Sequence, residues 1–158
     1  MAELKKVFES LGFTNVKTLL NSGNVVFSST EKDVRLLKTS LEQKFEDVFT
    51  FSSQIIVCRS DEIQTLVQSD PFKHLILTPE TRLYVTFLVD EPKSTLKIPY
   101  ESEENDFGIL QVSKKAICSF LILSPKRGSL DLMSFIEKEF GKNVTTRNWN
   151  TVKKLAAL

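Results

Sequence analysis

The order in which helical and extended segments follow one another restricts the fold of this chain more than any other feature. Apolar residues recur every three or four positions in residues 2–11, 31–48 and 129–140, which is typical of amphipathic helices. Between them lie β-rich runs such as "NVVFS" and "AICSFLIL". The second half of the chain is predicted to be strand, short helix or loop, strand, strand, helix, strand. The first half is predicted to be helix, strand, strand, helix, strand, so one order occurs twice apart from a missing first strand.

This repetition predicts an α+β fold of two tandem ferredoxin-like (βαββαβ) halves, each an antiparallel sheet with helices packed on one face. The predicted parts are 1–59 for the first half, 60–80 for a helical connector, 81–147 for the second half and 148–158 for a C-terminal helix. The first strand of such a half is normally central, so its neighbours lack a backbone partner. Three explanations stay open: a trimmed chain, a strand supplied by another protomer, or a wrong assignment of this half.

Two individual segments carry further structural predictions. "QIIVC" at residues 54–58 is predicted to be the strand that ends the first half. "EPKSTLKIPYESEENDF", rich in acids and prolines, is predicted to be a surface excursion with room for one helical turn. Cys58 and Cys118 lie in apolar runs without CxxC spacing, which indicates buried, reduced thiols and neither a disulfide nor a metal site.

The composition argues against several classes of partner. With 21 Lys and Arg against 20 Asp and Glu, the net charge of +1 gives no global attraction to DNA or to an anionic membrane. No apolar run approaches the roughly 20 residues that span a bilayer, and no signal segment is evident. Asn24, Val25 and Val26 stand where an RNA-binding sheet would carry stacking aromatics. We therefore expect a cytoplasmic protein that binds neither membranes nor nucleic acid and has no cofactor.

Two polar motifs are the leading candidates for a ligand site. "NSGN" combines compact hydrogen-bonding side chains with a glycine that permits close backbone approach, but these residues are also typical of a plain hairpin turn. In "TRNWN", Asn148 is placed to cap the last helix and Trp149 to dock it. Arg147 and Asn150 have no such structural role in the sequence pattern. The guanidinium of Arg147 can hold a phosphate or carboxylate. The candidate ligand residues are Asn21, Ser22, Gly23, Asn24, Arg147, Asn148, Trp149 and Asn150.

A third segment, "SPKRGS", is an alternative site for an anion. It places Lys126, Arg127, Gly128 and Ser129 at the start of a predicted helix, where free N–H groups favour anions. A plain turn with solvated charges is the favoured interpretation of this segment. His74 has no serine or cysteine nucleophile near it in sequence, and the acidic run from Glu101 to Asp106 is most typical of a solvated loop. The sequence therefore predicts no catalytic constellation.

The segments "MAELKKVFESLGFTNVKTLLNSGNVVFSS" and "TTRNWNTVKKLAAL" resemble the family of bacterial proteins known as domain of unknown function 1697. Members of that family usually begin with a further strand and a glycine-rich loop, which this chain lacks. The resemblance implies a cytoplasmic α+β fold with ferredoxin-like halves and supplies no established activity.

Three functional hypotheses follow. The leading one is a small cytoplasmic binding or interaction protein, not an enzyme, with a small anionic or nucleotide-like ligand near "NSGN" and "TRNWN". The second is an enzyme acting on an anionic small molecule, which needs a titratable group of perturbed pKa near Arg147. The third is a homo-oligomeric scaffold in which an exposed sheet edge pairs with another copy.

Overall fold

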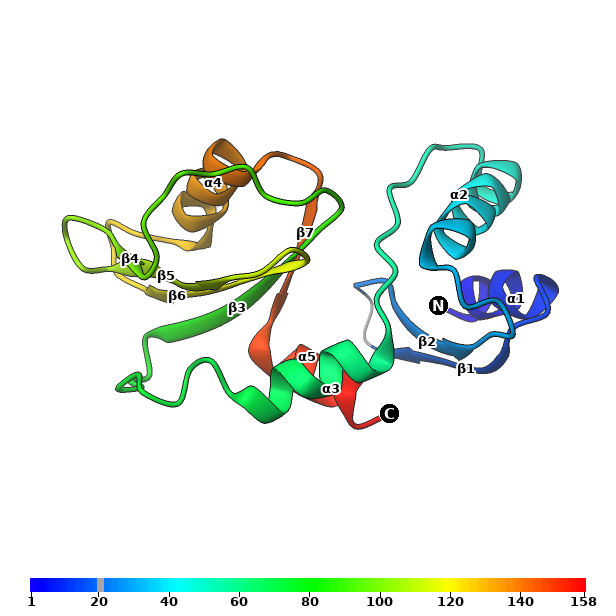
Figure 1. The fold of residues 1–158 in the computed structure, drawn as a ribbon, viewed down its shortest axis with the longest axis horizontal. Coiled ribbons are helices and arrows are strands. Elements are labelled where there is room, and N and C mark those ends of the chain that lie inside the picture. The colour runs from blue at the N-terminus through cyan, green and yellow to red at the C-terminus, as the bar shows by residue number, and fades with distance from the viewer. Residues whose placement is uncertain (20–21) are drawn as a thin grey trace. The chain divides into compact units, whose positions relative to one another are not determined.

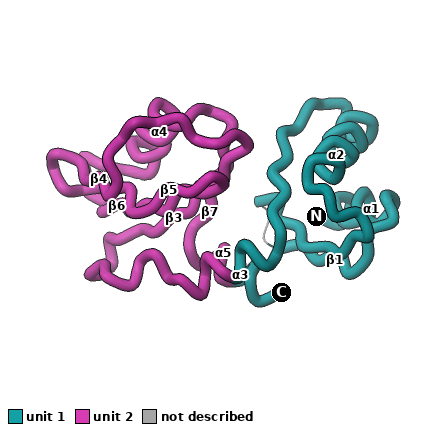
Figure 2. The backbone as a smooth tube through the Cα atoms, in the orientation of Figure 1, with its two compact units in different colours: residues 1–64, 154–158 teal, residues 65–153 magenta. Residues whose placement is uncertain are grey.

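The computed structural model describes residues 1–19 and 22–158, and the chain divides into two compact units. Unit 1 comprises Met1–Gln64 and Lys154–Leu158, and unit 2 comprises Thr65–Lys153 (Figure 2). The boundary between the units falls inside two helices, α3 (Ser60–Ser69) and α5 (Trp149–Ala156). Both units combine helices with antiparallel strands, which confirms the predicted α+β class.

Unit 1 contains a two-stranded antiparallel sheet with helices on one of its faces (Figure 1). In chain order its elements are α1 (Ala2–Ser10), β1 (Thr14–Leu19), β2 (Asn24–Ser28) and α2 (Val34–Phe49). α2 begins where the Asp33 carboxylate accepts a hydrogen bond from the backbone N–H of Arg35, and it ends at Thr50 in the left-handed conformation.

Phenylalanine rings from three elements form the core of unit 1. Phe8 of α1 is 5 % exposed, and its ring lies 5.1 Å from that of Phe27 on β2 and 6.2 Å from that of Phe45 on α2. Leu41 of α2, 1 % exposed, completes the buried centre together with Val16. The helical and alternating apolar positions of the sequence therefore meet in one cluster.

Residues 54–58 form no strand in the part of unit 1 that the structure describes, so the predicted strand "QIIVC" is wrong. The segment does contribute to the core, because Ile55 and Val57 pack against the Phe8 cluster. A strand also needs a neighbouring backbone at ladder distance, and the described sheet of this unit consists of β1 and β2. The apolar alternation is thus real, whereas the pairing is missing.

Unit 2 is built on a five-stranded sheet with the order β4-β5-β6-β3-β7, in which every neighbouring pair is antiparallel. Its elements are β3 (Thr81–Leu88), β4 (Tyr100–Glu101), β5 (Phe107–Val112), β6 (Ala116–Ile122), α4 (Ser129–Phe140) and β7 (Val144–Asn148). The continuous apolar run "AICSFLIL" supplies β6, which lies in the middle of the sheet as predicted. Burial on both faces explains why it lacks alternation.

α4 covers one face of this sheet (Figure 1). Leu132 and Ile136 of the helix, both at most 1 % exposed, pack on Ile117 and Leu121 of β6. The segment predicted to be a surface excursion differs from that prediction. It contains no helical turn, and Leu96, Ile98 and Tyr100 at alternate positions pack against the same core. Apolar residues spaced by two thus bring this polar-looking loop onto the sheet.

Gly108 of β5 lies close to the backbone of β4 and to the Phe120 ring of β6. A Cβ atom at this position would lie 2.5 Å from Cε1 of Phe120 and 2.6 Å from the backbone oxygen of Tyr100. Both distances are shorter than a carbon atom tolerates. The absence of a side chain is therefore what allows β4 and the Phe120 ring to pack here.

Candidate functional site

Arg147 lies on β7, on the face of the sheet opposite α4. Val144 packs in the core beneath α4, and successive side chains of a strand alternate, so Thr145 and Arg147 share the other face. Nη1 of Arg147 donates to Oγ1 of Thr145 at 2.8 Å and to the backbone oxygen of Thr146 at 2.9 Å. These bonds fix the orientation of the guanidinium.

The pKa values of Arg147 and Arg127, the arginines of the two candidate anion sites, are shifted in opposite directions. Arg147 is partly buried, and this loss of solvation lowers the pKa of its guanidinium. The Asp106 carboxylate beside Arg127 instead raises the pKa of that group. The shift at Arg147 thus comes from burial, and the shift at Arg127 comes chiefly from the neighbouring carboxylate.

Asn148 and Trp149 have the structural roles that the sequence predicts. Oδ1 of Asn148 accepts hydrogen bonds from the backbone N–H and the hydroxyl of Thr151, both at 2.9 Å, and so caps α5. The Trp149 ring is 7 % exposed and lies edge-on to Phe72, with 5.0 Å between ring centroids. Asn150, by contrast, is exposed.

Ser22, Gly23 and Asn24 of the "NSGN" motif lie at the start of β2, where Asn24 pairs with Leu19 of β1. Gly23 adopts a positive φ of 76°, which a glycine accommodates without strain. The Asn24 side chain is buried, and its Nδ2 donates to the backbone oxygen of Leu19 at 3.1 Å and to Oγ of Ser22 at 2.8 Å. These bonds give Asn24 a structural role in the turn. Asn21 lies outside the described residues.

The two motifs belong to different compact units. Asn24 is part of unit 1 and Arg147 is part of unit 2, and the structure describes each unit by itself. A site shared by the two motifs therefore stays a prediction.

The alternative anion site is occupied by the chain's own carboxylates. Nε of Arg127 lies 2.7 Å from Oδ2 of Asp106, and the side chain of Asp131 accepts the backbone N–H of Gly128 at 2.8 Å. Lys126 and Ser129 are exposed. The acidic run is also more ordered than a solvated loop, because Oγ of Ser102 donates to Asp106 at 2.6 Å. These bonds favour a structural role for "SPKRGS" over anion binding.

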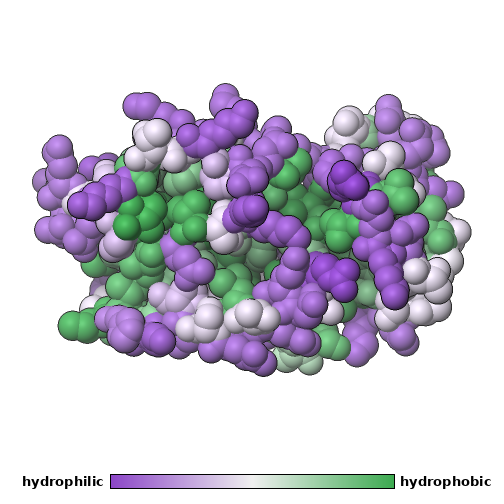
Figure 3. All heavy atoms as spheres, viewed as in Figure 1, coloured by the Kyte–Doolittle hydropathy of each residue, from purple (hydrophilic) through white to green (hydrophobic). Residues whose placement is uncertain are grey.

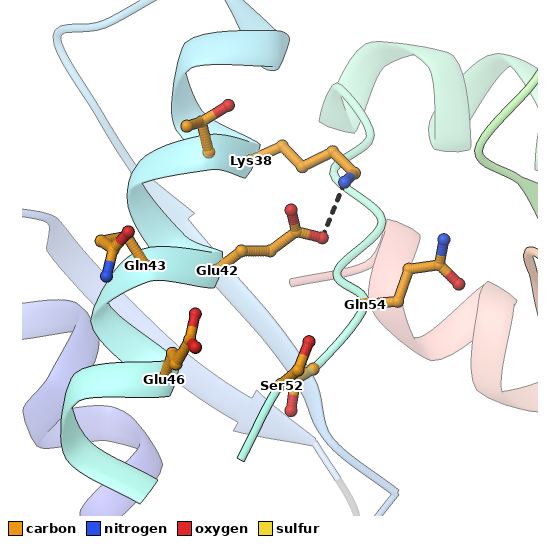
Figure 4. Close-up of a pocket in the computed structure, with 8 residues that line it drawn as sticks. Lys38, Glu42, Gln43, Glu46, Ser52 and Gln54 are labelled. Atoms are coloured by element: carbon orange, nitrogen blue, oxygen red, sulfur yellow. Dashed lines mark hydrogen bonds and ion pairs between the residues drawn. The ribbon is translucent and has the colours of Figure 1, made fainter. Parts of the chain in front are cut away.

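A pocket of about 410 Å³, which the sequence did not predict, lies between α2 and residues 52–54 (Figure 4). Oε1 of Glu42 lies 2.7 Å from Nζ of Lys38 and accepts the backbone N–H of Ile55 at 2.9 Å. Burial acts to raise the pKa of Glu42, but the two hydrogen bonds and the lysine charge outweigh it, and the pKa is lowered. The signal in the sequence is the Lys38–Glu42 spacing of four. The polar residues that line the pocket are Lys38, Thr39, Glu42, Gln43, Glu46, Ser52, Ser53 and Gln54.

The remaining candidate residues give no chemical site. Cys118 is fully buried and Cys58 is partly exposed, so the prediction of a buried thiol is wrong for Cys58. Burial raises the pKa of Cys118 to about 12. His74 is exposed. Within residues 1–19 and 22–158, no group of three or more His, Cys, Asp or Glu side chains is arranged to hold a metal ion.

The molecular surface mixes polar and apolar residues. Figure 3 shows them interspersed over one face. Ile76 is 91 % exposed and Leu130 80 % exposed, so some large apolar side chains do stand in solvent. Among the described residues, no helix is both long enough and apolar enough to cross a membrane.

These observations define an α+β protein whose polar motifs lie in two compact units. Residues 1–117 match the family model described as "Protein of unknown function (DUF1697)", and the chain belongs to that family, which confirms the resemblance drawn from its sequence. The matched range includes Asn24 and ends before Arg147.

A comparison with solved structures supports the fold. The conserved bacterial protein SP0830 from Streptococcus pneumoniae is similar, with a TM-score of 0.70 and 20% sequence identity over 99% of this chain and 87% of that chain. At this identity, the likeness shows the fold alone. No curated protein matches the chain.

Proposed function

We propose that this protein is a small binding protein that holds an anionic or nucleotide-like ligand at Arg147. The partly buried guanidinium, held by Thr145 and the backbone of Thr146, carries this proposal. A planar guanidinium of fixed orientation suits the bidentate recognition of phosphate or carboxylate. Its lowered pKa reflects the solvation that the guanidinium loses through burial.

The contributions of the neighbouring residues differ. The Trp149 ring packs against Phe72, which supports a role in docking α5 more than a role in stacking on a ligand. Asn150 lies three residues after Arg147 and is exposed, so its side-chain amide can contact a ligand at the surface. Ser22, Gly23 and Asn24 would join the site only if the hairpin turn of unit 1 lies next to Arg147.

Thermal-shift measurements with inorganic phosphate, adenosine monophosphate and citrate test the proposal. A ligand at 100 times its Kd stabilises a protein by roughly 2.7 kcal/mol, which raises the Tm of a chain of this size by roughly 5–10 °C. Losing charge-assisted hydrogen bonds costs roughly 1.5–3 kcal/mol, so Arg147→Ala should weaken binding by about tenfold or more.

Two matched variants make the result specific. Arg147→Lys keeps the charge but loses the planar donor pair, and it should bind with intermediate affinity. Arg82→Ala removes an exposed arginine from the neighbouring strand β3 and should leave binding unchanged. Equal weakening by Arg82→Ala and Arg147→Ala would indicate nonspecific charge attraction and refute the site. Ser22→Ala tests the hairpin: unchanged affinity would remove the turn from the proposal.

We also propose the finer fold assignment, two ferredoxin-like halves. In unit 2 the four long strands follow the chain as β3, β5, β6 and β7 and lie in the order β5-β6-β3-β7, with the first and third central. That order and the helix α4 before β7 support a βαββαβ half whose first helix is replaced by the segment 89–106. The boundaries 1–59, 60–80, 81–147 and 148–158 remain predictions.

The other hypotheses stay predictions as well. An enzyme acting on an anionic small molecule would need a titratable base beside Arg147. A homo-oligomeric scaffold would need an open sheet edge that pairs with its own copy. The cytoplasmic location is likewise untested.

A further inference from the structure

The polar pocket of unit 1 lies where the chain turns back along α2. Thr50 adopts the left-handed conformation with a φ of 57°, and the helix ends there. Residues 52–54 then line the pocket together with one side of α2. The Glu42 carboxylate accepts the backbone N–H of Ile55 at 2.9 Å, which joins the returning segment to the helix. The two walls of the pocket are therefore connected within unit 1.

The charges that line the pocket favour a cation. The lining includes one ammonium group, that of Lys38, and two carboxylates, those of Glu42 and Glu46. Nζ of Lys38 lies 2.7 Å from Oε1 of Glu42, so these two charges offset each other. Among the described residues, Glu46 has no ion-pair partner. A further positive charge is thus attracted to the pocket, and an anion is repelled.

The ion pair of Lys38 shows how an ammonium group meets these carboxylates. In Figure 4 the side chains of Lys38 and Glu42 extend from α2 toward the segment that carries Gln54. Oε1 of Glu42 accepts both the lysine and the N–H of Ile55, whereas Oε2 accepts no hydrogen bond from the residues that the structure describes. Glu46 follows Glu42 by one helical turn, so the two carboxylates lie on the same side of α2. The unused oxygens are thus arranged to receive a second ammonium group while Lys38 keeps its place.

The opposite wall supplies neutral hydrogen-bonding groups. In the part of the chain that the structure describes, the side chains of Ser52, Ser53 and Gln54 make no hydrogen bond to the protein. Hydroxyl and amide groups both donate and accept, so they suit the polar part of an organic ligand. The volume of about 410 Å³ also falls within the range of roughly 300–1,000 Å³ that small-molecule sites occupy. We propose that this pocket binds a small molecule with a primary ammonium group, held by Glu42 and Glu46. The other polar groups of the ligand contact the two serines and Gln54.

This site is separate from the one proposed at Arg147. Arg147 belongs to unit 2 and is proposed to hold an anion, whereas every residue that lines the pocket belongs to unit 1. The two proposals concern ligands of opposite charge, so the failure of one leaves the other standing.

Titration of the isotope-labelled full chain with diaminobutane, followed by NMR, tests the proposal. The diamine should shift the backbone amide signals of residues 38–46 and 52–55, including that of Ile55, whose N–H is bonded to Glu42. Butanediol has a similar length and carries hydroxyls in place of the ammonium groups, and it should bind about tenfold more weakly. Binding of the diamine should also weaken as the salt concentration rises.

Two matched variants separate the pocket from the rest of the surface. Glu46→Gln keeps the size of the side chain and removes its charge, so it should weaken diaminobutane binding by about three- to fivefold, the scale of an exposed ion pair. Glu3→Gln removes an exposed carboxylate of α1 outside the pocket and should leave the affinity unchanged. Glu46 is exposed as well, so both variants should keep the Tm of the wild type.

Three outcomes would overturn the proposal. If these amide signals stay in place at the highest soluble concentration of diaminobutane, the pocket does not take an ammonium group. Equal affinity for butanediol would show that the carboxylate charges do not select the ligand. Equal weakening by Glu3→Gln and Glu46→Gln would show a general attraction of cations to the surface of unit 1.

Discussion

Replacing Gly108 with alanine tests whether the contact between β4, β5 and Phe120 is as close as the structure shows. The added Cβ would lie 2.5 Å and 2.9 Å from Cε1 and Cζ of the Phe120 ring and 2.6 Å from the backbone oxygen of Tyr100. The ring can rotate or shift, but the oxygen belongs to a residue paired with Ile109 across the β4-β5 ladder. Main chain must therefore move.

Overpacking of a well-packed core costs roughly 1–3 kcal/mol. We expect Gly108→Ala to destabilise the protein by about 2–3 kcal/mol, because backbone as well as ring atoms obstruct the new methyl group. At roughly 2–4 °C per kcal/mol for a chain of this size, the Tm should fall by roughly 4–12 °C. Circular dichroism during heating measures the Tm, and urea unfolding gives the free energy.

Gly128→Ala is the matched control, because a Cβ there meets no atom within 4 Å among the described residues. Phe120→Leu in the Gly108→Ala background removes the ring clash but not the oxygen clash, so it should recover only part of the loss in a double-mutant cycle. If Gly108→Ala melts within about 2 °C of Gly128→Ala, the close packing inferred at this position is wrong.

Four shorter predictions concern other residues. Among the described residues the buried hydroxyl of Ser119 has no hydrogen-bond partner, so Ser119→Ala should raise the free energy of unfolding in urea by about 1 kcal/mol; a loss would point to an unseen partner. Asn148→Ala should cost about 1 kcal/mol by removing the α5 cap, and Asn148→Ser should restore most of it. The hydrogen bond from Ser102 and the charge of Arg127 lower the pKa of Asp106 in spite of its burial. The ionised Asp106 therefore contributes its full stabilisation of the fold above the unfolded-state pKa near 4, and this stabilisation is lost as the pH falls below that value. The difference in free energy of unfolding between wild type and Asp106→Asn should therefore shrink on acidification. A difference that does not change with pH would contradict the Asp106–Arg127 ion pair. With a pKa of about 12, Cys118 should resist thiol reagents at pH 8 while Cys58 reacts, as mass spectrometry can show.

Sequence periodicity was sufficient to predict the elements whose partners lie in the same sheet or core. The run "AICSFLIL" had no alternation because both faces of β6 are buried, and its central place followed from that. Periodicity was not sufficient to predict the structure of residues 54–58, because a strand is defined by its backbone pairing and not by its own side chains. Leu96, Ile98 and Tyr100 were overlooked since the acids and prolines around them resemble a solvated loop.

In the candidate site, too, contacts between residues close in sequence were easier to predict than contacts between distant ones. The cap at Asn148 could be predicted because it depends on Thr151, three residues further along the chain, whereas the contact of Trp149 with the distant Phe72 could not be read from local pattern. The pairing of Arg127 with Asp106 joins residues 21 positions apart and needed the hairpin β5-β6 to bring them together. Whether Arg147 meets a second motif is likewise a question of distant contacts, which local patterns do not encode.

β7 passes directly into α5, with Asn148 as the last strand residue and Trp149 as the first helical one. Side chains alternate every two residues along β7 and repeat every 3.6 residues around α5, and no linker residue separates the two elements. The register of β7 in the sheet therefore determines which side chains of α5 face the core. One residue inserted at this junction would turn Trp149 about 100° around the helix axis, away from Phe72, or would move Arg147 to the other face of the sheet. We therefore expect the length of this junction to be restricted, whereas residues 89–93, which precede the alternating Leu96, Ile98 and Tyr100, can change in number without altering that alternation.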